Sequence, residues 1–158
     1  LLVQHMGAAF MPGFAAWLDT QTALAVKIAE DGERPMRGFA YVAPGDRHLV
    51  LDRAGILRID AGPPVGGQRP AATALFRSLA LHAGASAVGV LLTGMGEDGA
   101  AGLLAMRQAG ALTLAEDASS AVVYGMPAAA ARLGAVSDLL PLDAIASRLQ
   151  RLAREARP

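Results

Sequence analysis

The chain has 158 residues and a mass of 16.1 kDa, the usual size of one domain with a single hydrophobic core. Hydrophobic residues make up 53% and charged residues 18%, which excludes an intrinsically disordered chain. The net charge of +0 does not favour nucleic acid or an anionic membrane as a partner, and a count of 0 cysteines excludes disulfides, thiolate metal sites and a cysteine nucleophile.

The apolar runs are too short to cross a membrane. The best of them, Val88 to Leu92, is broken by Thr93 and Gly94. There is no signal peptide, so we predict a cytoplasmic protein without direct membrane insertion. The chain opens on Leu1-Leu2-Val3, typical of a strand already under way, and we therefore expect one domain over 1–158 that is truncated at its N-terminus.

The first third of the chain predicts a strand, a helix and a group of short strands. Leu1 to Val3 is the first strand, and apolar residues at helical spacing over 10–18 predict a helix. Asp-Gly, Pro-Gly and Ala-Gly turns separate the next segments, which favours a small antiparallel hairpin insertion. Its strands are predicted at Ala25–Ile28, Ala40–Val42, Leu49–Leu51 and Ile56–Ile59.

The rest of the chain alternates between helix and strand after a Gly- and Pro-rich loop over 61–70. Helices are predicted at 70–82, 100–109, 127–133 and 142–154, and strands at 87–93, 111–114 and 136–139. This order favours an α/β fold, with a doubly wound, mostly parallel sheet and the small antiparallel hairpin insertion.

Two polar clusters follow predicted strands, where open α/β sheets bind ligands. Gln4-His5 follows the first strand, and 93–99 follows the strand over 87–93. If the two strand ends approach each other, His5 and Asp98 form the base and the orienting carboxylate of a hydrolase triad. The alternative is a solvated His5 with Asp98 capping the helix that starts at Ala100.

The second cluster also spells Gly94-Met95-Gly96-Glu97-Asp98-Gly99, a G-x-G-x-x-G pattern between a strand and a helix. Glu116 and Asp117 end the next strand, near where a ribose-binding acid belongs in dinucleotide folds. Against this alternative, Glu97 and Asp98 put negative charge where a pyrophosphate needs bare N–H groups. We expect no cofactor.

No serine stands where a nucleophile is needed. Ser86 follows a helix and precedes a strand, the reverse of a nucleophile elbow, and Ser119-Ser120 suits the capping of a turn. His48 and His82 lack paired carboxylates, so we expect them at the surface or the core edge, and no metal site.

Several long motifs in one order resemble the catalytic domain of the CheB-type chemotaxis protein-glutamate methylesterases. The motifs are Gln4-His5-Met6, 30–34, 40–48, 60–64, Arg69-Pro70, 87–102 and 122–127. The resemblance runs over the whole chain. It implies an α/β domain whose Ser-His-Asp triad hydrolyses glutamyl methyl esters on chemoreceptors, often with glutamine deamidation.

Carried over, His5 looks like the general base and Asp98 like the carboxylate that holds it. The family's serine segment also supplies backbone N–H groups to the oxyanion site, and backbone around Met95 lines its other wall. The family's serine lies in a Gly-Ala-Ser-x-Gly-Gly stretch ahead of the strand that ends at His5, so we expect this chain alone to be inactive. The implied partners are the cytoplasmic domain of a methylated chemoreceptor and a receiver domain, with no nucleic acid. Ala71-Ala72-Thr73 departs from the family's usual Asp-containing pattern. The open alternative is a non-catalytic, degenerate interaction module.

Overall fold

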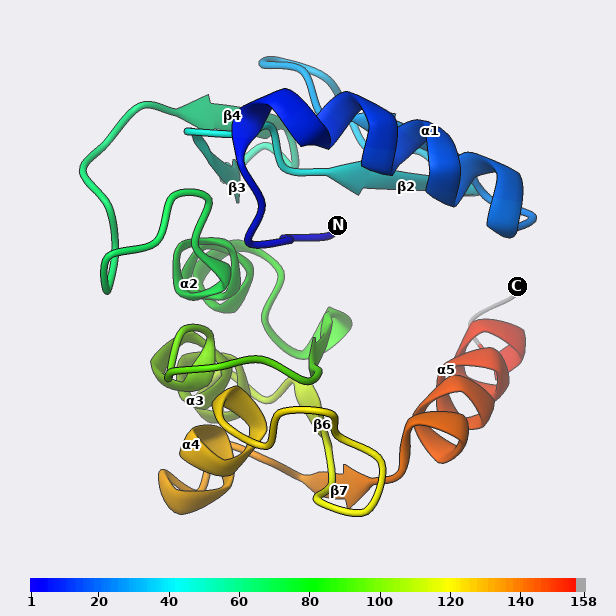
Figure 1. The fold of residues 1–158 in the computed structure, drawn as a ribbon, viewed down its shortest axis with the longest axis vertical. Helices are drawn as coiled ribbons and strands as arrows, with labels where there is room; N and C mark the ends of the chain where they lie inside the picture. The colour runs from blue at the N-terminus through cyan, green and yellow to red at the C-terminus, as the bar shows by residue number, and fades with distance from the viewer. Residues whose placement is uncertain (156–158) are drawn as a thin grey trace.

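The computed structural model describes residues 1–155 as alternating helices and strands (Figure 1). The α-helices are α1 (Met11–Gln21), α2 (Ala72–His82), α3 (Ala100–Gln108), α4 (Met126–Arg132) and α5 (Leu142–Glu155), and 3-10 turns lie at Ala8–Phe10 and Gly84–Ser86. The strands are β1 (Ala25–Ile28), β2 (Phe39–Val42), β3 (His48–Leu51), β4 (Leu57–Asp60), β5 (Val88–Leu91), β6 (Leu112–Glu116) and β7 (Asp138–Leu140). The predicted α/β fold class is confirmed.

The strands pair mostly in parallel. β5, β6 and β7 form one parallel sheet, and β1 pairs with β2 in parallel register. Only β3 and β4 form the antiparallel hairpin, so the prediction of an antiparallel insertion was wrong for β1 and β2. The segment between those two strands folds over β4 instead of turning back, with hydrogen bonds from Gly32 N to Leu57 O and from Leu57 N to Glu33 O.

The first residues run along β2. Leu2 pairs with Val42 in parallel, with hydrogen bonds of 2.8 Å from Leu2 N to Tyr41 O and from Ala43 N to Leu2 O. This is an isolated bridge and not the strand that we predicted over Leu1 to Val3. The parallel direction nevertheless carries the chain to the carboxyl end of β2, where His5 follows.

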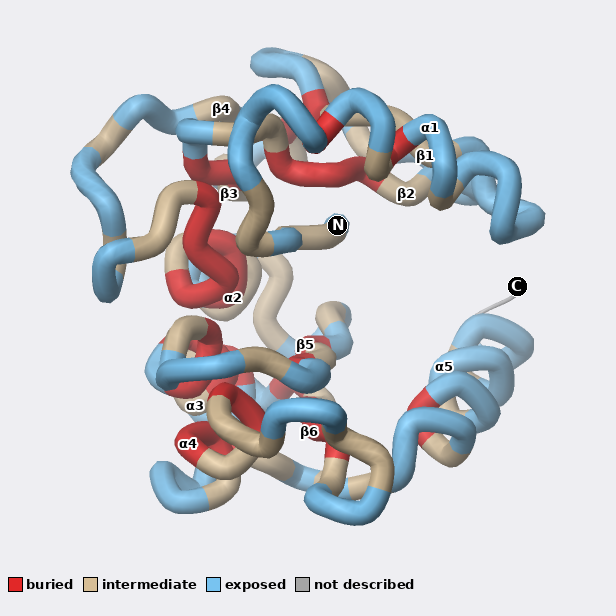
Figure 2. Tube along the Cα trace, viewed as in Figure 1, coloured by how far each residue is buried: buried red, intermediate tan, exposed pale blue. Residues whose placement is uncertain are grey.

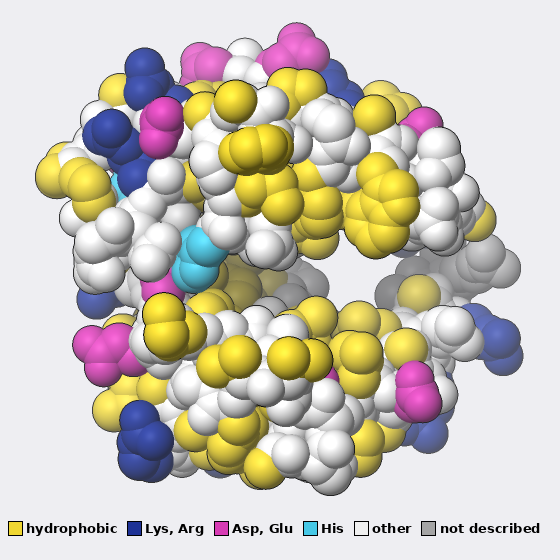
Figure 3. All heavy atoms as spheres, in the orientation of Figure 1, with side chains coloured by type: hydrophobic (Ala, Val, Ile, Leu, Met, Phe, Trp, Pro, Cys, Tyr) yellow, Lys and Arg dark blue, Asp and Glu magenta, His cyan; other side chains and the backbone are white. Residues whose placement is uncertain are grey.

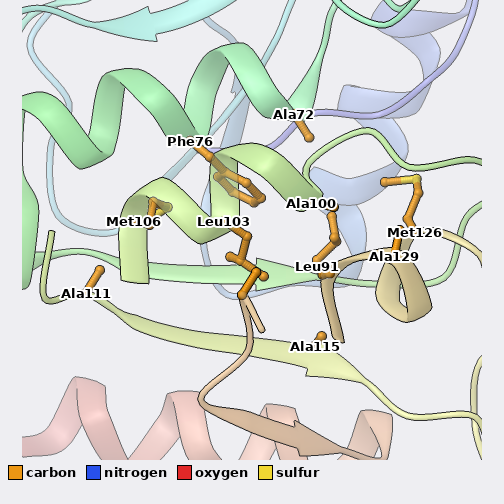
Figure 4. Packing of buried hydrophobic residues seen from close by; sticks show 12 residues of the cluster. Ala72, Phe76, Leu91, Ala100, Leu103, Met106, Ala111, Ala115, Met126 and Ala129 are labelled. Carbon is orange, nitrogen blue, oxygen red and sulfur yellow. The ribbon is translucent and has the colours of Figure 1, made fainter. Parts of the chain in front are cut away.

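Helix α2 joins the two halves of the molecule (Figures 1 and 2). Its residues Ala72 and Phe76 belong to the core built with α3, α4, β5 and β6 (Figure 4). Leu75 belongs to a second core with Tyr41, Leu49 and Leu57. Because α2 packs into both cores, the position of its N-terminus is tied to both halves.

Helices cover both faces of the β5–β6–β7 sheet, with α3 on one side and α5 on the other (Figures 1 and 4). This layering fits the doubly wound arrangement, since parallel strands are normally buried on both faces. Across residues 1–155, no helix is both long and apolar enough to span a bilayer.

The contact of α2 with α3 depends on Gly102. A Cβ atom at Gly102 would lie 2.7 Å from Cβ of Phe76 and 2.9 Å from the carbonyl oxygen of Thr73. We expect Gly102→Ala to lower the free energy of unfolding by about 1 to 3 kcal/mol, because overpacking outweighs the better helix propensity of alanine. Urea denaturation measures this. Gly13→Ala in α1 is the matched control, since nothing lies within 4 Å of its Cβ position, and it should stabilise slightly. Equal effects of the two substitutions would contradict the packing argument.

Candidate active site

His5 and Asp98 meet although 93 residues separate them. Nε2 of His5 lies 2.7 Å from Oδ2 of Asp98, and the two side chains are 25% and 5% exposed. This distance is within the range that we expected for an imidazole and the carboxylate that orients it. Among residues 1–155, the other ring nitrogen of His5 has no hydrogen-bond partner, so it is free to exchange a proton with a bound group.

Asp98 is held by the start of α2 and by its own loop. Its Oδ2 accepts the N–H of Ala72 at 2.7 Å, and its Oδ1 accepts the N–H of Thr73 at 3.0 Å and of Gly99 at 2.8 Å. Gly99 has a φ of +86°, a conformation that suits glycine, and its N–H also reaches Oγ1 of Thr73 at 2.7 Å. The helix that Asp98 caps is therefore α2, not the following helix that we had considered.

These hydrogen bonds set the charge of Asp98. Burial by itself would raise the pKa of this carboxyl group, but hydrogen bonds from His5, from Thr73 and from the Ala72 N–H outweigh it. The net result is a pKa lowered from 3.8 to about 2. Asp98 is thus ionised at neutral pH, as a carboxylate that stabilises a protonated imidazole must be.

His5 opens on a cavity of about 610 Å³ between the two halves of the molecule. Figure 3 shows the hollow between the upper and lower parts. One wall comes from Leu1 to Gln4, and the opposite wall from 90–95. The cavity is also lined by Gln68, Ala72, Leu75, Phe76, Met126 and Leu149. Asp98 lines a neighbouring cavity of about 450 Å³, and Met95 lines both.

The glycine-rich loop is not arranged as a dinucleotide site. The N–H of Gly99 is taken by Thr73 and Asp98, and the N–H of Ala100 by the carbonyl oxygen of Glu97. A pyrophosphate would need these groups free. Glu116, the candidate ribose-binding acid, is buried and accepts hydrogen bonds from Thr93 N at 2.8 Å and from Ser120 Oγ at 2.9 Å. It fixes the loop that follows β5, a role that the sequence did not indicate.

The other candidates lie away from His5. No serine of residues 1–155 hydrogen-bonds to its ring, and Ser86 bonds to the carbonyl oxygen of Ala83 on the surface. His48 is only 2% exposed, so it lies in the core and not at the surface. Within the same residues, no group of three or more His, Asp or Glu side chains is placed to hold a metal ion.

Known proteins with similar sequences share one described activity. A model of the CheB methylesterase family matches residues 1–149. The protein-glutamate methylesterase/protein-glutamine glutaminase 2 of Xanthomonas oryzae pv. oryzae is 51% identical over 160 residues, which cover 99% of this chain and 45% of the relative. The corresponding enzyme of Yersinia pestis bv. Antiqua is 52% identical over 152 residues, covering 94% of this chain and 44% of the relative.

A solved structure matches the fold as well. The crystal structure of the Thermotoga maritima CheB methylesterase catalytic domain superposes with a TM-score of 0.90 at 37% identity, over 95% of this chain and 81% of that one. The chain spans about 45% of the length of the curated relatives. Because the family model matches 149 of the 158 residues, the chain belongs to the CheB methylesterase family.

Proposed function

We propose that this chain carries the base and the orienting carboxylate of a serine hydrolase that removes methyl esters from glutamyl side chains. The observation that carries the proposal is the contact of 2.7 Å between His5, which lines a cavity, and an ionised Asp98 whose side chain is 5% exposed. The substrate is a glutamyl methyl ester on the cytoplasmic domain of a chemoreceptor. Glutamine deamidation follows the same chemistry with an amide in place of the ester.

The reaction runs in two steps. The free nitrogen of His5 takes the proton of a serine hydroxyl as the oxygen attacks the ester carbonyl, and Asp98 stabilises the imidazolium. His5 returns the proton to the departing methoxide, so methanol leaves and an acyl-enzyme remains. Water, activated by the same imidazole, then releases the glutamate. Backbone N–H groups around Met95 are suited to bind the oxyanion, since this loop lines the cavity.

The serine must come from a segment that ends beside His5. The resemblance assigns it to a strand followed by Gly-Ala-Ser-x-Gly-Gly, and the cavity has the features that such a strand needs. β5 is an edge strand of its sheet, and the residues around Leu2 pair with β2 on one side. β5 and the residues around Leu2 both run toward the site, and the cavity lining between them is largely apolar. An apolar lining suits a parallel strand that is buried on both faces.

The test supplies that segment. A synthetic peptide with a Val- and Ile-rich strand followed by Gly-Ala-Ser-Ala-Gly-Gly is added to the chain, and methanol release from a peptide containing γ-methyl glutamate is measured. The control peptide carries Ala in place of Ser. We expect methanol only with the Ser peptide.

Hydrogen exchange of the β5 amides is measured to detect binding of the peptide. A bound Ser peptide without methanol release would overturn the proposal and favour a non-catalytic module. If the peptide does not bind, the same segment is joined covalently ahead of Leu1, once with Ser and once with Ala, and methanol release is compared again. Release with the Ser version only would support the proposal, and no release with either version would overturn it.

A further inference from the structure

His48 is a buried, titratable side chain that the proposed reaction does not use. It begins β3 and is 2% exposed. Its Nδ1 lies 3.2 Å from the backbone N–H of Ala71, and its Nε2 lies 3.0 Å from the carbonyl oxygen of Pro63. Since the first partner only donates and the second only accepts, the ring is neutral with its proton on Nε2.

The Ala71 N–H is the first of three consecutive backbone donors at the start of α2. Ala71 itself is extended, with φ −117° and ψ 132°, and has no side chain that could cap the helix. The next two N–H groups, of Ala72 and Thr73, donate to Asp98. The backbone of 71–73 therefore donates hydrogen bonds to His48 at one end and to Asp98 at the other.

We infer that His48 is a positioning residue for the His5–Asp98 pair. By fixing Ala71, it sets where the N–H groups of Ala72 and Thr73 point, and these groups orient the Asp98 carboxylate toward His5. The importance of this pair for catalysis rests on the proposed function. The positioning itself does not, because it can be measured in the chain without any turnover.

Two variants of similar size separate positioning from simple core packing. In His48→Asn, the side-chain oxygen stands near the place of Nδ1 and keeps an acceptor for the Ala71 N–H. In His48→Gln, the amide stands near the place of Nε2 and keeps a donor for the carbonyl oxygen of Pro63, but the acceptor is lost. Each variant removes one buried hydrogen bond, so the losses of stability should be comparable.

The readout is the Asp98 carboxyl group, titrated by carbon-13 NMR. We expect its pKa to stay near the starting value in His48→Asn and to rise by about half a unit or more in His48→Gln. The nitrogen-15 shifts of the His5 ring should move in the second variant only. Equal titration of Asp98 in the two variants would overturn the inference, and so would a larger change in His48→Asn.

A second measurement applies if neither variant folds. The scalar coupling between Ala71 N–H and Nδ1 of His48 reports their hydrogen bond directly. Coupling between two sites is reciprocal, so Asp98→Asn, which retains one oxygen acceptor, should weaken that coupling. An unchanged coupling would overturn the inference. Failure of the peptide-complementation assay leaves both measurements intact, so the two proposals can fail separately.

Discussion

Asp98→Asn lowers the turnover of a glutamyl methyl ester by about four orders of magnitude, the loss known for the same replacement in another Ser-His-Asp hydrolase. The experiment uses the chain complemented with the serine segment. An amide at position 98 can offer its NH₂ group to Nε2 of His5, which favours the wrong tautomer of the ring. It also carries no charge to stabilise the imidazolium. The loss should appear mainly in kcat, because Asp98 acts after the substrate is bound.

Glu97→Gln is the matched control. Glu97 is the neighbouring carboxylate in the same loop and lines the cavity of about 450 Å³ that Asp98 also lines. Of these two carboxylates, only Asp98 accepts a hydrogen bond from His5. Each substitution removes one negative charge, so a general electrostatic effect would reduce turnover similarly in both. A loss in Asp98→Asn of less than about tenfold over the control would contradict an orienting role.

Asp98→Ala lowers the free energy of unfolding by about 3 to 5 kcal/mol at pH 7. The substitution leaves the N–H groups of Ala72 and Thr73 without their acceptor in a region that is largely closed to water, at about 1 to 3 kcal/mol each, and removes the contact with His5. The loss of the Asp98 acceptor costs less free energy at Gly99, because Oγ1 of Thr73 still accepts the Gly99 N–H. Asp98→Asn keeps one oxygen and should cost clearly less. Urea denaturation of the three proteins measures the difference.

The ionisation of Asp98 also determines how the free energy of unfolding changes at acidic pH. The pKa of Asp98 is about 2 in the folded chain and 3.8 ordinarily, so the folded state holds the ionised form more strongly. Its contribution is fully present above the ordinary pKa and is lost as the pH falls through 3.8 toward 2. The contribution is about 2 kcal/mol, and no large screening applies because the side chain is 5% exposed. Asp98→Asn should flatten the stability curve between pH 5 and 2, and superimposable curves would contradict the assignment.

The periodicity of the sequence was sufficient for the elements around the site. β5 and α3 lie where the continuous apolar run and the Gly110 stop place them, within a few residues. The strand-end rule brought His5 and Asp98 forward as a possible pair but could not decide between the pair and a helix cap. The segment before His5 pairs with β2, whereas β5 lies in another sheet, so the sequence did not show that the two strand ends meet.

The details of how Asp98 is held could not be predicted. Local capping rules look at residues close in sequence, whereas Asp98 caps a helix that begins 26 residues earlier. The start of α2 gives no sign of this, since Ala71 and Ala72 carry no capping side chain. Thr73 appeared only as a departure from the family pattern, yet its N–H and Oγ1 both take part in the loop that holds the carboxylate.

The burial of His48 and the pairing of β1 with β2 share a second cause. Both depend on long connections that fold back over other elements, the segment 29–38 over β4 and the segment 61–70 over His48. The Asp31-Gly32 turn in the first segment is typical of a hairpin, and the Gly and Pro residues of the second are typical of a loop. Neither composition shows that the segment crosses another element.

Covalent labelling of the serine tests whether His5 activates a serine held at this cavity. A fluorophosphonate is added to the chain with the bound Ser peptide, and the rate of label attachment to the peptide is followed by mass spectrometry. Serine attack on phosphorus expels fluoride, and the rate depends on removal of the hydroxyl proton. We expect rapid labelling with the unsubstituted chain and a rate lower by about a hundredfold or more with His5→Gln. Equal labelling rates with the two chains, both with the peptide bound, would contradict this role of His5.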